Sequence, residues 1–293
     1  MIVVRIWGGL GNQMFQYAFG YAMAKKHDCP LYLDTRFYGQ KHSSWTTDRL
    51  LGLLKFPIEY TEIIASPYKI SLFLPFLQSP IVNYAIRRFL PRKISLGKYT
   101  YVKEDKLEYI PCVLIPNKSD IYYDGYWHSA KYFDEYRRDL ENQFVVKDDL
   151  VDEAFALMSE DWRDAELVAV HIRRGDYITQ NNPNAMGEDY YKSAIEACKK
   201  RVRNPVFCFF SDDLQWVSDK FKDVPNAIMA NADRKLDDMQ ELQLMQRCHH
   251  QIISNSSYSW WAAWLNGNPH KIVIAPMFWK NKKDMMPDEW LRI

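Results

Sequence analysis

The sequence has few cysteines, almost no net charge and no long hydrophobic run. Its five cysteines are dispersed and never form a Cys-x-x-Cys pair, so they indicate neither a disulfide framework nor a structural zinc and fit a reducing compartment. A net charge of +1 argues against a protein-wide attraction to nucleic acid. The longest apolar stretch, at 70–77, is too short to span a bilayer. We therefore expect a cytoplasmic protein.

The chain also shows no secretory signal, because strand-like residues 2–7 follow Met1 directly. Of its 293 residues, 47% are hydrophobic and 15% aromatic, which is typical of a globular protein of one large domain or, more often, two. The charge is uneven, since no acidic residue occurs between Glu62 and Glu104 while basic residues recur there. We expect the segment 66–103 to contact anionic lipid peripherally or to form a solvated insert.

The first half opens with a βαβ pattern. A β-rich run at 2–7 leads into the glycine-rich turn 8–12, a helix-like stretch at 13–27 and a second strand at 31–34. Four prolines between 66 and 95 leave short amphipathic helices at best. A strand at 121–126 and a helix at 130–141 are expected to close this half.

The second half alternates more regularly and begins with an acidic helix at 147–164. Strands are expected at 167–172, 206–210, 227–230, 251–254 and 271–275, and helices at 189–201, 214–221, 236–248 and 258–265. Near-continuous apolar strands separated by helices predict a doubly wound parallel sheet covered on both faces. Such a sheet binds ligands at the carboxyl ends of its strands, so the polar residues that follow each strand are the candidate site residues.

Two adjacent arginines follow the strand at 167–172. In an extended chain, His171 and Arg173 point to one side and Arg174 to the other. A guanidinium matches phosphate oxygens in a bidentate way, so we interpret Arg173 as a ligand-binding residue. We interpret Arg174 as structural, paired with Asp176 within the loop.

Two adjacent aspartates follow the strand at 206–210. They could accept from a ligand hydroxyl, bind a metal or cap the next helix, and Ser211 or Asp212 is the expected cap. The pair Asp212-Asp213 is not the Asp-x-Asp spacing expected where a metal holds a pyrophosphate. Metal binding is therefore the weaker interpretation.

A run of small hydroxyl residues follows the strand at 251–254 and enters a helix. Backbone N–H groups and hydroxyls at a positive helix N-terminus form a seat for an anion. Asn255 or Ser256 could cap the same helix, and capping is compatible with anion binding. Upstream, Glu241 could accept from a purine edge, although a helical Glu is more often a surface charge.

The glycine-rich turn supports a competing interpretation. Gly9-x-Gly11, with Asp34 at the end of the next strand, imitates the dinucleotide-binding fingerprint, although Met14 occupies the third glycine position. An NAD-dependent oxidoreductase is therefore a second hypothesis.

Aromatic residues are frequent enough to suggest sugar binding. Trp45, Trp127 and Trp279 lie among polar residues and could stack on sugar faces, although a Trp is more often part of the core. A glycan-binding protein without catalytic activity is a third hypothesis.

Four motifs taken together resemble those of the bacterial α1,2-fucosyltransferases of glycosyltransferase family 11. They are GGLGNQMFQYA at 8–18, HIRRGDY at 171–177, FSDD at 210–213 and SNSSYSWW at 254–261. The resemblance implies an α/β, GT-B-like fold in which two Rossmann-like domains face a cleft. It implies an acceptor-side domain at 1–155, a GDP-fucose-binding domain at 156–275, and a C-terminal segment at 276–293 that packs back on the first domain.

The same resemblance implies an inverting transfer of L-fucose from GDP-β-L-fucose to the 2-hydroxyl of a galactoside, in an oligosaccharide or a surface glycan such as an O-antigen. It implies no cofactor and no required metal, and a place in the cytoplasm or peripherally at the inner membrane. A fucosyltransferase of different linkage is the alternative within the same group.

Residue roles also follow from the resemblance, including the more distant likeness to α1,6-, Nod-factor and protein O-fucosyltransferases. It implies that Arg173 binds the β-phosphate, that His171 lies near the guanine and that Glu241 contacts the base edge. The implied catalytic residues are Arg173, Asp176 and His171. The implied donor-binding residues are Gly9, Gly11, Asn12, His171, Arg173, Asp212, Glu241, Asn255, Ser256 and Ser257.

Attack by a hydroxyl requires a group that takes its proton. The resemblance to the α1,6 enzymes implies a carboxylate a few residues beyond the HxRR aspartate. This chain has Tyr177 to Asn181 there instead. Asp176 and Asp34 are the two candidates for the general base.

Overall fold

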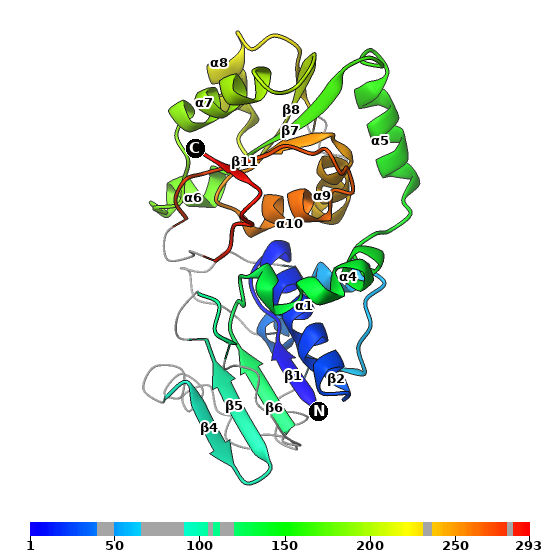
Figure 1. The fold of residues 1–293 in the computed structure, drawn as a ribbon, viewed down its shortest axis with the longest axis vertical. Helices are drawn as coiled ribbons and strands as arrows, with labels where there is room; N and C mark the ends of the chain where they lie inside the picture. The colour runs from blue at the N-terminus through cyan, green and yellow to red at the C-terminus, as the bar shows by residue number, and fades with distance from the viewer. Residues whose placement is uncertain (40–49, 66–90, 105–107, 112–119, 231–235, 280–283) are drawn as a thin grey trace. The chain divides into compact units, whose positions relative to one another are not determined.

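The structure, a computed structural model, describes residues 1–39, 50–65, 91–104, 108–111, 120–230, 236–279 and 284–293. The chain forms two compact units, Met1–Phe144 and Val145–Ile293 (Figure 1). Each unit contains a sheet with flanking helices, in agreement with the α/β prediction. Most of the basic segment, and Trp45, lie outside the described residues.

The first unit contains the expected βαβ start. Its elements are β1 (Ile2–Arg5), α1 (Leu10–Lys26), β2 (Leu31–Asp34), β3 (Glu62–Ile64), β4 (Lys93–Leu96), β5 (Tyr99–Lys103), β6 (Asp120–Asp124) and α4 (Arg137–Gln143). Short 3-10 turns lie at Arg36–Gly39, Leu53–Lys55, Ala130–Tyr132 and Asp134–Tyr136. The expected helix at 130–141 is thus two such turns followed by α4.

The described strands of the first unit form one sheet in the order β3-β2-β1-β6-β5-β4. All neighbours are parallel except β4 and β5, which form an antiparallel hairpin. Helix α1 lies close against the sheet, since a Cβ added at Gly20 would come within 2.8 Å of the Val4 side chain. The carboxyl ends of β2, β1 and β6 therefore meet at one edge.

The second unit follows the predicted alternation closely. Its elements are α5 (Asp149–Ser159), β7 (Glu166–Ile172), α6 (Gly175–Thr179), α7 (Glu188–Lys199), β8 (Pro205–Ser211), α8 (Leu214–Phe221), β9 (Ala227–Met229), α9 (Asp238–Arg247), β10 (His250–Ile252), α10 (Ser257–Leu265), β11 (Val273–Ala275) and β12 (Leu291–Arg292). The sheet order is β12-β11-β10-β7-β8-β9, and every pair is parallel.

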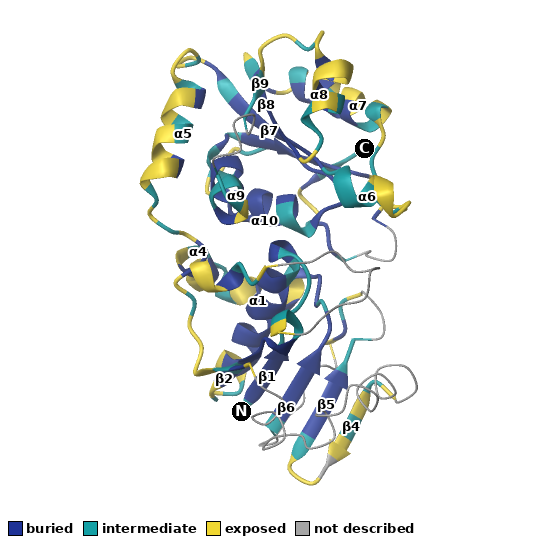
Figure 2. Ribbon diagram, turned by 180° about the vertical axis from the view of Figure 1, so that it is seen from behind, coloured by how far each residue is buried: buried dark blue, intermediate teal, exposed yellow. Residues whose placement is uncertain are grey.

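Helices cover both faces of the second sheet. Buried side chains of α7 and α8 pack on alternate residues of β7 and β8, including Val168, Val170 and Phe209. Helices α9 and α10 lie on the other side (Figure 1). Figure 2 shows the strands between them as buried almost throughout. Because both faces are apolar, the polar chemistry of this unit is confined to the ends of its strands.

Two predicted domain limits differ from the structure. Helix α5 falls within 1–155 in part but belongs to the second unit, where Asp152 pairs with Arg247 of α9 at 2.6 Å. The segment 276–293 was expected to pack on the first domain, but its strand β12 pairs with β11 of the second sheet. Backbone pairing along the open edge of the second sheet attaches the C-terminal segment to the second unit.

None of the helices within the described parts of the chain is sufficiently long and apolar to cross a membrane.

Candidate functional site

The predicted motifs of the second unit meet at one edge of its sheet. Strands β10, β7 and β8 are neighbours, with Val170 aligned with Ile252 on one side and with Phe209 on the other. Their parallel direction brings the residues that follow each strand, at 173–176, 212–213 and 253–257, to the same edge. This is where a doubly wound sheet binds its ligand.

Arg173 lies between two carboxylates. Its Nη2 is 2.6 Å from Oδ1 of Asp176 and its Nη1 is 2.8 Å from Oδ2 of Asp212. Burial lowers the pKa of Arg173. The nearby carboxylates of Asp212 and Asp176 raise the pKa by a larger amount, so the net shift is upward. The side chain is 26% exposed. Arg173 is therefore a permanent cation, fixed in orientation and accessible in part, and a guanidinium carries five N–H donors in all.

Arg174 is held in a structural environment. Its guanidinium lies 4.0 Å from the centre of the Trp216 ring, and its Nε donates to Oδ2 of Asp213 at 3.0 Å. Its backbone N–H donates to Oδ1 of Asp212 at 2.8 Å. The expected pair with Asp176 was wrong, because strand pairing brings the carboxylates that follow β8 closer to Arg174 than its neighbour in sequence.

Asp212 thereby connects the loop that follows β8 with the loop that follows β7. One of its oxygens faces Arg173 and the other accepts from the backbone of Arg174. A Cβ added at Gly175 would come within 2.8 Å of Oδ2 of Asp212, so a larger residue here would displace this carboxylate. Asp213, rather than Ser211 or Asp212, caps α8 by accepting from the backbone N–H of Trp216 at 3.2 Å.

Within the described residues, no group of three or more His, Cys, Asp or Glu side chains is placed to hold a metal ion.

His171 is buried at the end of β7. Its Nδ1 hydrogen-bonds with Oγ of Ser254, which follows β10, at 2.9 Å. Burial, and then the charge of Arg173, lower the pKa of His171 to about 3. The imidazole is therefore neutral at physiological pH, so it can exchange hydrogen bonds with a ligand but does not supply a positive charge.

Tyr258 brings the helix of Glu241 towards His171. The Tyr258 ring lies 5.6 Å from the His171 ring, and its hydroxyl donates to the backbone carbonyl of Asp238 in the first turn of α9. Burial raises the pKa of Tyr258, and the nearby carboxylate of Glu241 adds to that shift. Sequence reasoning missed both Ser254 and Tyr258, although each lies in a motif that follows a strand.

The N-terminus of α10 completes this edge. Ser256 caps the helix by accepting from the backbone N–H of Tyr258 at 3.3 Å, and Ser257 is its first residue. Asn255 is buried, donates through Nδ2 to the carbonyl of Phe278 at 3.2 Å, and accepts on its own carbonyl from the Tyr177 hydroxyl at 2.9 Å. The cap is therefore Ser256, and Asn255 fixes the loop before it.

The glycine-rich turn of the first unit begins α1. Gly8 has a φ of +84°, which favours glycine, and Gly9 is the N-cap residue of α1. Gly11 lies buried in the first turn of the helix. Oδ1 of Asn12 hydrogen-bonds with Nε2 of His128 at 3.0 Å. The turn thus consists of backbone with few side chains, and the polar side chain of Asn12 lies beside it.

Asp34 is a buried member of an ion pair. Both its oxygens accept from Arg36, with Nε and Nη2 each at 2.8 Å, and the Tyr122 hydroxyl donates to it as well. The residue is only 2% exposed. This engagement argues against Asp34 as a general base and as the acid of a dinucleotide site, which must reach a ribose.

Of the three tryptophans that could stack on sugars, two belong to the core and Trp45 lies outside the described residues. Trp127 and Trp279 are both buried. The first unit instead presents Trp7 and Tyr126, which follow β1 and β6 and are only half-buried. Their position directly after strands is a signal that sequence reasoning could have used.

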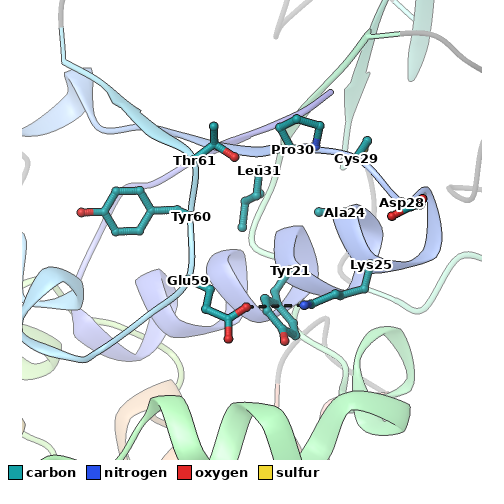
Figure 3. Close-up of a pocket in the computed structure, with 10 residues that line it drawn as sticks. All are labelled: Tyr21, Ala24, Lys25, Asp28, Cys29, Pro30, Leu31, Glu59, Tyr60 and Thr61. Carbon is teal, nitrogen blue, oxygen red and sulfur yellow. Dashed lines mark hydrogen bonds and ion pairs between the residues drawn. The ribbon is translucent and has the colours of Figure 1, made fainter.

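A pocket of about 500 Å³ opens at the other end of the first sheet. It is lined by Tyr21, Ala24, Lys25, Asp28, Cys29, Pro30, Leu31, Glu59, Tyr60 and Thr61 (Figure 3). Lys25 and Glu59 form an ion pair across it at 3.4 Å. Leu31 begins β2 and Thr61 precedes β3, so the pocket lies at the amino ends of the strands and contains no predicted site residue.

The fold is of GT-B type, because the structure resembles those of solved GT-B proteins. The structure is similar to that of NodZ α1,6-fucosyltransferase soaked with GDP-fucose, with a TM-score of 0.53, 13% identity, and coverage of 90% of this chain and 91% of that one. It is also similar to an Arabidopsis thaliana FUT1 variant in complex with GDP, with a TM-score of 0.54, 11% identity, and coverage of 98% and 72%. At these identities the likeness establishes the fold alone.

The chain belongs to glycosyl transferase family 11, whose model matches residues 1–292. It is 34% identical to an α1,2-colitosyltransferase of Escherichia coli, over 100% of this chain and 99% of that protein. It is 31% identical to the E. coli O-antigen biosynthesis glycosyltransferase WbnK, over 98% of both chains. A mouse galactoside 2-α-L-fucosyltransferase, Sec1, is 25% identical over 91% of this chain and 65% of that one.

Proposed function

We propose that this family 11 enzyme transfers L-fucose from GDP-β-L-fucose to the 2-hydroxyl of a galactoside, with inversion and without a metal ion. The observation that carries the proposal is Arg173, a partly exposed cation at the carboxyl edge of the second sheet, beside the loop that leads to the N-terminus of α10. The galactoside 2-α-L-fucosyltransferase among the relatives supports both the linkage and the acceptor class.

The charge that develops in the reaction matches these groups. The acceptor oxygen forms a bond to C1 of fucose while the bond from C1 to the phosphate oxygen breaks, and the electron pair leaves with GDP. Negative charge therefore grows on the β-phosphate. Arg173, with the hydroxyls of Ser256 and Ser257, stabilises it from fixed positions at the strand ends.

The acceptor proton needs a carboxylate. Asp34 is buried with both oxygens engaged, which leaves Asp176 as the candidate at the edge of the second sheet. Asp176 is 15% exposed and contacts Arg173 through Oδ1. Inversion places the attacking hydroxyl on the face of C1 opposite the phosphate, so this role requires that the hydroxyl reach Oδ2 of Asp176 while Oδ1 stays on Arg173.

The guanosine end of the donor fits the buried side of the same edge. His171 is neutral, so it offers a donor or an acceptor to the base without electrostatic attraction for the phosphates. Glu241, on the helix that Tyr258 connects to His171, is of the type that accepts from the N–H groups of a guanine edge.

A second candidate is transfer of colitose, which lacks the 3-hydroxyl of fucose. The E. coli α1,2-colitosyltransferase that shares 34% identity favours it. Both sugars carry the same methyl group at C5 and differ at one hydroxyl only. A site that hydrogen-bonds the 3-hydroxyl would reject colitose strongly, because a buried polar group would lose its partner.

A competition assay tests both. GDP-fucose and GDP-colitose are supplied together with a panel of β-galactosides, and the products are assigned for sugar, linkage and anomeric configuration by NMR. We expect an α1,2-linked fucoside, at an undiminished rate in EDTA. A preference for colitose would select the second candidate, and a large loss in EDTA would make Asp212 and Asp213 metal ligands.

A melting experiment tests the NAD hypothesis separately. GDP should raise the melting temperature by mass action, whereas NAD should leave it unchanged. Stabilisation by NAD and not by GDP would reject the proposal.

A further inference from the structure

Two side chains connect the loop that follows β7 with the loop that leads into α10. His171 hydrogen-bonds through Nδ1 with Oγ of Ser254 at 2.9 Å. Tyr177 donates its hydroxyl to the backbone carbonyl of Asn255, also at 2.9 Å. Strands β7 and β10 pair in parallel, so the two loops leave the sheet as neighbours. Arg173 lies between the two connecting residues in sequence, and its loop is therefore fastened to the next loop on either side of it.

Tyr177 also contacts the arginine itself. The Arg173 guanidinium lies 5.9 Å from the centre of the Tyr177 ring. Tyr177 belongs to the first turn of α6, which also supplies Asp176, the partner of Arg173 at 2.6 Å. The backbone carbonyl of Tyr177 accepts from the N–H of Asn182 at 2.8 Å. This half-buried tyrosine thus places its ring beside the cation and its hydroxyl on the loop of the neighbouring strand.

The carbonyl that accepts from Tyr177 belongs to the residue before the helix cap. Asn255 is buried, Ser256 caps α10 and Ser257 is the first residue of the helix. The backbone N–H of Ser256 donates to the carbonyl of Ser254 at 2.8 Å, which makes this loop a tight turn. A displacement of the Asn255 carbonyl would therefore also move the two serines.

We propose that Tyr177 is a positioning residue, which sets the distance between Arg173 and the two serines at the N-terminus of α10 so that they meet the same diphosphate. The inference rests on the proposed function for its ligand. It requires only the diphosphate, which GDP-fucose and GDP-colitose share, and no contact between Tyr177 and the substrate. Fixed donors stabilise a developing charge only when residues behind them hold their geometry, and the Tyr177 hydroxyl connects the two loops that carry them.

The β-phosphate gives this role a specific signature. GMP lacks the β-phosphate, to which the proposed function assigns Arg173, but carries the same guanosine as GDP. An altered distance between Arg173 and the serines should therefore weaken the binding of GDP and spare that of GMP. A general loss of order in the second unit should weaken both, because both nucleotides use the His171 side of the edge.

The test compares two tyrosine–carbonyl hydrogen bonds of the same unit. The variants are Tyr177→Phe, which keeps the ring, and Tyr177→Leu, which removes it. The matched control is Tyr190→Phe, because the Tyr190 hydroxyl donates to the backbone carbonyl of Ile253 at 2.6 Å from α7. Ile253 is also held by the sheet, since its N–H donates to the carbonyl of Ile274 at 2.9 Å.

The dissociation constants of GDP and GMP are measured by calorimetry, donor kcat and KM by initial rates with whichever GDP-sugar the wild type uses, and stability by the melting temperature. We expect Tyr177→Phe to raise the Kd of GDP and the donor KM by about fivefold, the effect of one hydrogen bond, with the Kd of GMP unchanged. Tyr177→Leu should show a larger rise, since the ring beside the guanidinium is lost as well.

The control and a double variant separate positioning from structural support. Tyr190→Phe should lower the melting temperature and keep the wild-type ratio of the two dissociation constants. Adding Tyr177→Phe to Arg173→Ala should cause little further loss of GDP affinity, because the guanidinium whose distance it sets is absent. Additive losses in the double variant would overturn the inference.

The remaining outcomes distinguish this inference from the proposed function. An unchanged ratio of the GDP and GMP dissociation constants in Tyr177→Phe, or an equal weakening of both, would overturn the inference and leave the function standing. A wild type that transfers colitose and shows the expected change in Tyr177→Phe would support the inference and reject fucose as the donor sugar. A wild type that binds GDP no more tightly than GMP would overturn the inference together with the role of Arg173.

Discussion

The two sheets carry the same kinds of charged residue at the same edge, in different environments. In the first unit, Asp34 and Asp124 are 2% and 3% exposed and are paired with Arg36 and Arg5. In the second unit, Arg173 contacts two carboxylates and yet is 26% exposed. Arginine and aspartate at a strand end therefore do not identify a site by themselves. Access to solvent separates a pair that holds the fold from one that can meet a ligand.

The tyrosines of the first sheet explain its closed edge. The hydroxyl of Tyr122 donates to Asp34, and that of Tyr101 donates to Asp124 at 2.9 Å. The two rings stack on each other with their centres 5.7 Å apart. Each buried carboxylate is thereby satisfied from both a cation and a hydroxyl. In the second unit the Tyr177 ring lies 5.9 Å from the Arg173 guanidinium, and the Arg173 side chain is still 26% exposed.

The largest effect on stability should come from breaking the buried ion pair of Asp34 and Arg36. Asp34→Ala removes the carboxylate that balances the buried cation Arg36, and we expect a loss of about 3–5 kcal/mol in the free energy of unfolding. Denaturant unfolding measures it. The control is Asp134→Ala, which breaks an exposed pair of the same unit with Arg137 and should cost less than about 1 kcal/mol. Equal losses in both variants would contradict the comparison.

Next in size is the effect on catalysis of removing Arg173, the partly exposed cation of the second unit. Arg173→Ala should lower kcat by about 10²–10³-fold, because the charge on the leaving phosphate loses a fixed donor. Steady-state kinetics measure the loss, and an unchanged melting temperature would show that the fold is intact. Arg174→Ala is the matched variant. It should lower the melting temperature, since Arg174 packs on Trp216, and should change kcat less than Arg173→Ala does. Near-normal turnover in Arg173→Ala would place Arg173 among the structural arginines.

These two arginines also show how far the sequence can be read. The alternation of side chains along an extended strand predicts different sides for Arg173 and Arg174, and the structure gives them different partners, but alternation could not supply those partners. Asp212 and Asp213 follow β8, whose place beside β7 follows from the folded sheet and not from any local pattern. Sequence proximity therefore suggested Asp176 for Arg174, and strand pairing supplied Asp213 instead.

The same limit applies to the tryptophans. The strands and helices of the second unit could be predicted because apolar runs and helical periods are local properties. For Trp127 the sequence left two interpretations open, a surface for a sugar or part of the core, and the structure buries its ring at a residue with a left-handed backbone while Tyr126 stays half-buried. A single residue of positive φ reverses the faces that alternation assigns. No periodic pattern signals it in advance.

His171 gives the comparison a pH dependence. Its pKa is about 3 in the folded chain and near 6.5 when unfolded, so between these values the unfolded state binds more protons. Stability from this group is fully present above about pH 6.5 and falls as the pH is lowered, by at most about 1.4 kcal/mol per pH unit.

Melting curves of the wild type and His171→Gln between pH 7 and 5 measure this contribution. The wild type should lose more stability than the variant over that range, so the gap between them should narrow on acidification. Parallel curves would show that His171 does not titrate in this way.

A smaller effect should follow from weakening the contacts of Arg173 without removing it. Asp212→Asn keeps the size of the side chain but offers one acceptor oxygen for two donors, the backbone of Arg174 and the guanidinium of Arg173. We expect about a tenfold fall in kcat/KM for the donor. A structural role alone would lower the melting temperature and leave the kinetics unchanged, whereas a positioning role changes the donor kinetics first.

The smallest effect concerns the basic segment 66–103, for which contact with anionic lipid and a solvated insert are the two interpretations. Each basic residue near such a surface contributes about 1 kcal/mol at most. Within the described part of this segment Lys98 is already 3.7 Å from Asp120, which reduces its contribution. Co-sedimentation with vesicles rich in phosphatidylserine should be detectable at low salt and absent at high salt. Absence of pelleting at both would make the segment a solvated insert.

Gly175 has a consequence for how variants of this enzyme combine. Its lack of a side chain creates the space in which the carboxylate of Asp212 lies, so the two positions share one small volume. A methyl group added at 175 and a charge removed at 212 would therefore reach the same defect in Arg173 by different routes. The two changes should be epistatic, with the double variant little worse than either single one.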